Sequence, residues 1–131
     1  MTAELTPDDV ELVKGNTTYA TLVTINEDGT PQASITWIDT EDGLILINTA
    51  EGRRKTRNLH RDPRVAVLVE AEPYRWMSIN GTVVETVPEP RALEHIDELK
   101  RRYDSKPWSP VLGQVRVIFR IRPDRIHRYE D

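Results

Sequence analysis

Apolar and polar residues alternate along much of this chain, which is the pattern of strands that bury one face. The alternation is clearest in residues 114–121, where every second position is apolar: Val115, Val117, Phe119 and Ile121. Other segments rich in β-branched and aromatic residues are also expected to be strands. They are residues 18–25, 32–38, 44–48, 64–70 and 76–87, with a short last strand at residues 125–129.

Three further segments carry helix signals. Residues 7–14 start with Thr6 as a cap, Pro7 at the first helical position and Asp9 where a capping acid belongs. Residues 51–61 are expected to form a charged helix that ends before Asp62-Pro63. Residues 91–103 follow the helical period, with an apolar stripe of Leu93, Ile96, Leu99 and Tyr103.

The connections between these segments are short. Residues 26–29 contain Asp-Gly, a strong hairpin signal, residues 39–43 form a second turn, and residues 106–113 form an irregular loop. Gly81 inside a strand indicates a bulge. Strands and helices do not alternate strictly, so a doubly wound parallel sheet is not expected. We expect one domain over residues 1–131, mainly β with peripheral helices (α+β), whose sheet closes into a small barrel to hide its edges.

Composition narrows the setting of the protein. The chain has no cysteine, which excludes disulfides and thiolate metal sites. No apolar run approaches the roughly 18 residues of a membrane helix. The first ten residues are acidic and polar, unlike a secretory signal. We therefore expect a cytoplasmic protein without a membrane partner.

Charge is distributed unevenly along the chain. The net charge is −4, yet residues 51–64 hold six Lys/Arg and two acids, a local balance of +4. The rest of the chain is therefore strongly acidic, which makes the protein a poor general nucleic-acid binder. We expect no nucleic-acid partner, and interpret the basic segment as a candidate site for a small anion.

The basic helix directly follows a strand, so its N-terminus offers free backbone N–H groups and a partial positive charge. Arg53 and Lys55 in the first turn add the cations that a phosphate needs. Helical spacing places Arg53, Arg54, Arg57 and Arg61 in one arc and Lys55 on the opposite, more inward face. A partly buried lysine is costly unless it meets an anion, which favours Lys55 as the phosphate contact. The alternative is a solvated helix whose arginines pair with acids elsewhere.

Five short motifs occur in a characteristic order: TLVTI at 21–25, DGTPQAS at 28–34, RRKTRNL at 53–59, DPRVA at 62–66 and GTV at 81–83. As a set they resemble the pyridoxamine 5′-phosphate oxidase-like family, and within it the branch of deazaflavin-dependent reductases that use coenzyme F420. The similarity is closest over about residues 5–87. It implies a split β-barrel of the FMN-binding type and a homodimer with a cofactor in each of two grooves between subunits.

The resemblance also implies which positions contact the cofactor. The implied phosphate contacts are Arg53, Lys55 and Thr56. Gln32 and Ser34 are implied at the edge of the ring, and Asn48 and Thr49 near the ring or the ribityl chain. Trp76 is implied as an aromatic neighbour of the cofactor. From the arc on the helix, Arg57 and Arg61 are candidates for contact with the acidic tail of the cofactor.

The implied activity is hydride transfer from F420H2 to a small conjugated or quinone-like substrate. The chain lacks the C-terminal substrate-phosphate signature of the oxidase itself, so pyridoxine chemistry is not expected. An FMN-binding flavoprotein and a non-enzymatic F420 carrier are the alternatives. No nucleophile motif such as G-x-S-x-G occurs, and in such proteins the cofactor carries the chemistry, so we expect no essential catalytic side chain.

The remaining aromatic residues and histidines suggest mainly structural roles. Trp37 is expected either to pack in the core or a dimer interface or to line the ring pocket. Trp108 is expected to pack a loop against the fold. The three histidines are far apart in the sequence, so no metal site is expected. One of them, His95, has acidic neighbours and is expected to be exposed.

Overall fold

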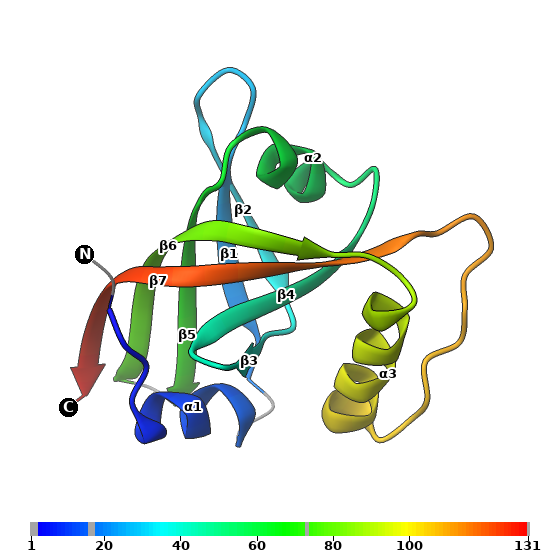
Figure 1. The fold of residues 1–131 in the computed structure, drawn as a ribbon. Coiled ribbons are helices and arrows are strands. Elements are labelled where there is room, and N and C mark those ends of the chain that lie inside the picture. Colours follow the sequence, from blue (N-terminus) through cyan, green and yellow to red (C-terminus); the bar gives the residue numbers. More distant parts are fainter. Residues whose placement is uncertain (1–2, 16–17, 73, 131) are drawn as a thin grey trace.

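The computed structural model describes residues 3–15, 18–72 and 74–130 and shows one antiparallel sheet with helices around it (Figure 1). The strand order in the sheet is β2-β1-β5-β6-β7-β4-β3. The expected mainly β architecture with peripheral helices is therefore confirmed. The elements are α1 Pro7–Lys14, β1 Ala20–Ile25, β2 Pro31–Thr36, β3 Asp39–Glu41, β4 Leu44–Ala50, α2 Arg54–Arg61, β5 Arg64–Glu72, β6 Arg75–Val87, α3 Arg91–Asp104 and β7 Arg116–Glu130.

Strands β6 and β7 bend sharply and give the sheet its barrel-like curvature (Figure 1). Their pairing register shifts between Asn80 and Gly81, which confirms the bulge expected at this glycine. The backbones approach closely there, because a Cβ on Gly81 would lie 2.6 Å from Cγ2 of Ile121. Only a glycine permits this contact, so the bend depends on this residue.

Alternating side chains on the strands fill the interior of the curved sheet. In β5, Val65, Val67 and Val69 are buried, and Phe119 of β7 is among the largest fully buried side chains. Strand β4 is buried on both faces: Ile45 and Ile47 join this main core, whereas Leu46 packs in a smaller cluster with Ala92 of α3 and Ile118 of β7. This two-sided burial explains why residues 44–47 are an uninterrupted apolar run.

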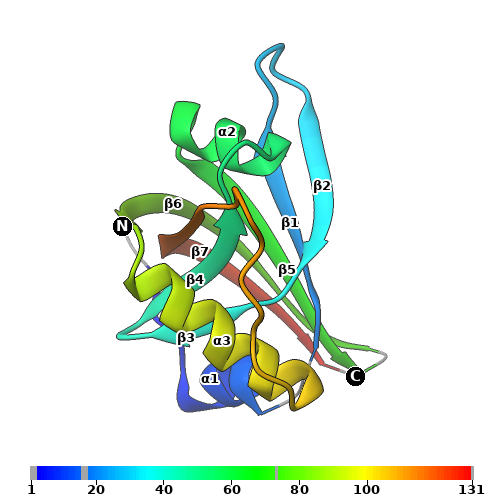
Figure 2. The ribbon, with the colours of Figure 1, turned by 90° about the vertical axis from the view of Figure 1, so that its right-hand side faces the viewer.

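Each helix covers a different part of the sheet. Figures 1 and 2 show α2 over one end of the barrel and α1 across the opposite end. Helix α1 begins with the expected capping box, in which the Thr6 hydroxyl accepts from the Asp9 N–H at 3.2 Å and the Asp9 carboxylate accepts from the Thr6 N–H at 2.7 Å. Helix α3 packs on the outer side of β4 and β7. Among the described residues, no helix has the length and apolar character needed to cross a bilayer.

Several sequence-based boundaries were wrong. Residues 18–19 and 37–38, expected in strands, lie outside β1 and β2. Residues 39–41, expected in a turn, form the edge strand β3, because Asp39 and Glu41 pair with β4. Residues 116–121 and 125–129, expected in two separate strands, belong to the single strand β7, since Pro123 lies at the register shift opposite Gly81, where a ladder N–H is not needed. Residues 114–115 precede this strand, and Val115 is 52% exposed rather than part of its buried face. The basic helix begins at Arg54 rather than residue 51, because Gly52 turns the chain with a φ of +90°.

Candidate functional site

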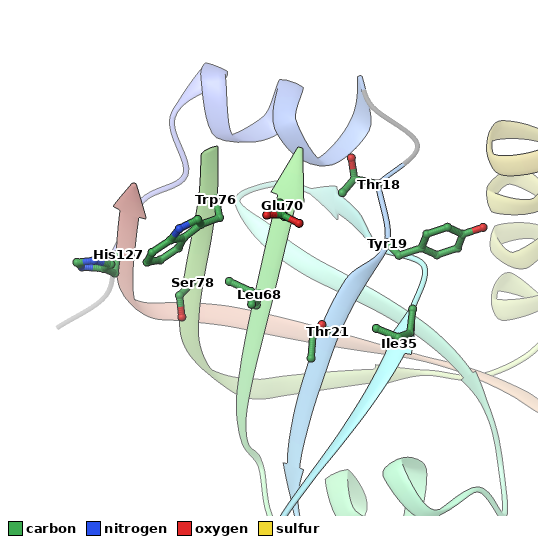
Figure 3. A pocket seen from close by; sticks show the side chains of 9 residues that line it. All are labelled: Thr18, Tyr19, Thr21, Ile35, Leu68, Glu70, Trp76, Ser78 and His127. Atoms are coloured by element: carbon green, nitrogen blue, oxygen red, sulfur yellow. The ribbon is translucent and has the colours of Figure 1, made fainter. Parts of the chain in front are cut away.

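Two adjoining grooves lie on the outside of the sheet. The larger one, here called the apolar groove, has a volume of about 710 Å³ and is bordered by outward-facing side chains of β1, β2, β5, β6 and β7 (Figure 3). Its walls include Tyr19, Ile35, Leu68 and Trp76, and Ile35 is 64% exposed. A large exposed apolar surface of this kind is suited to a flat ring or to another protein surface.

The smaller groove, here called the basic groove, has a volume of about 260 Å³. Tyr19 and Ile35 line both grooves, so the two are neighbours on one face of the molecule. Three cationic side chains line the basic groove: Arg53, Lys55 and Arg116. They come from the residue before α2, from the first turn of α2 and from the first residue of β7.

The cations of the basic groove are close enough to repel one another. Burial lowers the pKa of the Lys55 ammonium, and the charges of Arg53 and Arg116 lower it further. Burial and the Arg53 charge also lower the pKa of Arg116 to about 10, although the Glu89 carboxylate works in the opposite direction. Within the described part of the chain, none of the three cations forms an ion pair with a carboxylate. An anion bound here would relieve both the desolvation and the mutual repulsion.

Arg116 is the most tightly held of these cations. Its Nε donates to Oδ1 of Asn48 at 3.0 Å, and its Nη1 donates to Oε1 of Gln114 at 3.1 Å. The Trp108 ring lies 5.1 Å from the guanidinium carbon, in cation–π contact. Only 4% of the residue is exposed, so the guanidinium is fixed before any ligand arrives.

The arginines of α2 line a third groove, which Lys55 does not line. Arg54, Arg57 and Arg61 line it together with Asp28 of the β1–β2 hairpin. Arg53 was expected in the same arc, but it does not share it. It is the cap of α2, its backbone is extended, and it therefore does not follow the helical spacing. Arg57 also donates to the Gly52 carbonyl. The predicted phosphate contacts Arg53 and Lys55 line the basic groove, whereas the predicted tail contacts Arg57 and Arg61 line the third groove.

Two predicted contacts, Thr49 and Thr56, are buried between β4 and α2. Their hydroxyl oxygens are 3.1 Å apart, and that of Thr56 donates to the Ala50 carbonyl at 2.7 Å. Both residues are fully buried, so these hydroxyls connect the start of the helix to the strand. They line neither the apolar nor the basic groove.

The other predicted contacts fall into two sets. Asn48 lines the basic groove, and Trp76 lines the apolar groove, where its ring stacks on Tyr129 with centroids 5.5 Å apart. Gln32 and Ser34 on the edge strand β2 line neither groove, although their neighbour Ile35 lines both. The sequence-based set is thus only partly brought together within one chain.

The other tryptophans border the basic groove. Trp37 is half-buried and stacks on Tyr103 of α3, with centroids 5.0 Å apart and 8° between the ring planes. Trp108 packs the loop after α3 against that helix, because its backbone N–H donates to Asp97 at 2.8 Å. Both side chains combine structural packing with a place in the groove wall.

His95 was expected to be exposed, but it is fully buried. The acidic neighbours in the sequence point elsewhere, because Ala92, His95, Ile96 and Leu99 together form the inward stripe of α3. Among the described residues, no group of three or more His, Asp or Glu side chains is placed to hold a metal ion.

Arg116 was not among the predicted site residues. Its position in an alternating strand indicated only that it faces away from Val117 and Phe119. Its place beside Lys55 depends on the pairing of β7 with β4, where Arg116 is opposite Ala50. No short-range signal in the sequence reveals this pairing.

The chain belongs to the pyridoxamine 5′-phosphate oxidase family, whose model matches residues 5–129. The chain is similar to a solved structure named F420 reductase, with 29% identity, coverage of 93% of this chain and 98% of that one, and a TM-score of 0.79.

Two further solved structures are also similar. The conserved hypothetical protein Rv2991 from Mycobacterium tuberculosis is 29% identical, with coverage of 98% of this chain and 86% of that one and a TM-score of 0.78. HutZ, the heme storage protein from Vibrio cholerae, is 14% identical, with coverage of 97% and 96% and a TM-score of 0.68, which shows the shared fold alone.

Proposed function

We propose that this protein is an F420-dependent oxidoreductase that transfers a hydride from reduced deazaflavin to a small conjugated or quinone-like substrate. The observation that carries the proposal is the basic groove, where two desolvated cations, Lys55 and Arg116, and the exposed Arg53 adjoin an aromatic-lined groove. A ligand that joins a phosphate to a flat ring matches both halves of this surface. The 29% identity to the structure named F420 reductase supports this choice of ring.

In this proposal, the side chains of the chain bind and orient the cofactor and substrate. Lys55 and Arg53 hold the phosphate through charge-assisted hydrogen bonds, and Arg116 adds a third contact. Tyr19, Ile35 and Trp76 pack against the ring system or the substrate. When bound, the reduced deazaflavin supplies the hydride, and the protein supplies proximity and electrostatics. The accompanying proton comes from water.

We also propose that the working form is a homodimer in which a second copy covers part of the apolar groove. Ile35, Leu68 and Tyr19 on this face are 64%, 42% and 57% exposed, which is unusual for large apolar residues. Leu68→Arg should shift the protein toward the monomer in light scattering, whereas Glu72→Arg, at an exposed position of the same strand, should not. A wild-type protein that stays monomeric at high concentration would contradict the dimer.

Cofactor titration tests the proposed function. Purified protein is titrated separately with F420 and with FMN by fluorescence, and F420H2 oxidation is then followed with a panel of quinones and activated alkenes. Micromolar F420 binding with turnover supports the proposal. Tight FMN binding instead favours an FMN-dependent flavoprotein, and F420 binding without turnover favours a carrier. Absence of F420 binding overturns the proposal.

A further inference from the structure

A line of hydrogen-bonded side chains runs beneath α3 from Asp39 to the basic groove. Oδ2 of Asp39 lies 2.8 Å from Nε2 of His95, and Nδ1 of His95 lies 3.2 Å from Nδ2 of Asn48. Oδ1 of Asn48 then lies 3.0 Å from Nε of Arg116. His95, Asn48 and Arg116 are 0%, 6% and 4% exposed, so water does not compete for these bonds.

The charge of Asp39 fixes the direction of the first bond in this line. Burial acts to raise the pKa of Asp39, but hydrogen bonds from His95 and the Thr40 N–H and the charge of Arg102 lower it to about 2. A second cation, Lys14, lies 3.8 Å from the same carboxylate. The carboxylate is therefore ionised at neutral pH, and Nε2 of His95 donates its proton to it.

The histidine and the Ala92 carbonyl together then determine how the Asn48 amide faces. Nδ1 of His95 faces the Asn48 NH2 group, a donor, and so accepts a hydrogen bond from it. The other N–H of that group donates to the Ala92 carbonyl at 2.8 Å. The amide oxygen consequently points at Nε–H of Arg116. A flipped amide would set its NH2 group against that N–H, where neither group could accept.

We infer that His95 is a positioning residue for the anion site, since it fixes the Asn48 amide that holds the Arg116 guanidinium in the basic groove. This inference deepens the proposed function and, for the cofactor phosphate as the natural anion, rests on it. Arg116 Nη2 has no hydrogen-bond partner among the residues that the structure describes, so this group remains available to a ligand oxygen. Lys55 and Arg53 complete the contacts from the α2 side.

A role in stability alone would also bury this histidine, so the test has to separate affinity from stability. His95→Asn keeps an amide oxygen near the place of Nδ1 but does not reach Asp39. His95→Gln reaches Asp39 with an amide N–H but leaves the Asn48 NH2 group without its ring acceptor. The two variants therefore each keep one half of the natural contact.

The experiment measures affinity for inorganic phosphate and for F420 by calorimetry, and stability by urea unfolding. We expect His95→Asn to bind phosphate within about twofold of wild type. We expect His95→Gln to bind it about 5- to 20-fold more weakly, the effect of losing one charge-assisted hydrogen bond between the Arg116 guanidinium and the anion. Stability should follow the opposite order, with His95→Gln the more stable. In an Arg116→Met background, the two His95 variants should bind phosphate equally.

Affinities that follow the order of stability would overturn the inference, because a purely structural histidine predicts that order. Equal binding by the two variants with Arg116 present would overturn it as well, as would a wild-type protein that binds neither phosphate nor F420. If F420 does not bind but phosphate affinity shows the expected order, the positioning role stands and the proposed function fails.

Discussion

Lys55 is the residue at which the chemistry of the basic groove can be tested most directly. It is half-buried, its pKa is lowered first by burial and then by two neighbouring arginines, and it lines the basic groove. Arg54, the preceding residue, carries the same charge but is exposed and lines the third groove. The two residues therefore form a matched pair on one helical turn.

Lys55→Ala should weaken F420 binding by about 1–3 kcal/mol, the typical loss for a charge-assisted hydrogen bond. Arg54→Ala should leave the dissociation constant nearly unchanged, because its side chain faces away from the basic groove. Fluorescence titration of both variants provides the measurement. Equal effects of the two substitutions would indicate a diffuse field of positive charge rather than a defined phosphate contact.

At the residue scale, sequence reasoning succeeded where one helical turn carried the information. The partial burial of Lys55 followed from the helical period alone. The same period places His95 on the inward stripe of α3, but the polar partners of His95 and Arg116 could not be read, because they come from strands β3, β4 and β7, which are distant in sequence. Buried polar contacts between distant segments leave no periodic signal.

At the scale of elements, the bend of β6 and β7 depends on a single missing side chain. In Gly81→Ala, the new Cβ would lie 2.6 Å from Ile121 Cγ2 and 2.8 Å from the Arg122 carbonyl oxygen. Relief of this overlap requires a backbone shift, so we expect a loss of about 1–3 kcal/mol in the free energy of unfolding. Urea denaturation checks this value, with Asn80→Ala at the exposed neighbouring position as control. An undiminished midpoint would show that the bulge adapts easily.

Local sequence signals identified all three helices and most strands, but not every boundary. The capping box of α1 and the bulge at Gly81 were readable because each depends on a few adjacent residues. Strand β3 has only three residues, and their composition is typical of a turn. It forms a strand because it pairs with β4, which the composition of these residues does not reveal. Strand β7 continues past Pro123 because its partner β6 bends at the same place.

At the scale of the whole molecule, Asp39 connects elements that are far apart in the chain. Its carboxylate contacts His95 and Arg102 of α3 and lies 3.8 Å from Lys14 of α1. Burial acts to raise the pKa of Asp39, but hydrogen bonds from His95 and the Thr40 N–H and the charge of Arg102 lower it to about 2, below the ordinary value of 3.8. The ionised form is therefore favoured by folding.

This lowered pKa gives stability a defined pH dependence. The contribution of Asp39 is fully present above about pH 4 and is lost as the pH falls through about 2, because protonation then costs the folded state more than the unfolded state. After allowance for solvent screening, we expect about 1 kcal/mol from this group. Asp39→Asn should flatten the unfolding free energy between about pH 4 and pH 2, whereas Asp8→Asn, at an exposed position of α1, should leave the slope intact.

Tyr19 and Ile35 stand in the wall between the apolar groove and the basic groove. A group that moves either side chain on binding in one groove also changes the shape of the other groove, so binding in the two grooves is coupled. By thermodynamic reciprocity, if binding in one groove raises the affinity of the other groove, binding in the second raises the affinity of the first by the same factor. Because Tyr19 and Ile35 belong to both walls, a substitution at either residue should change binding in both grooves.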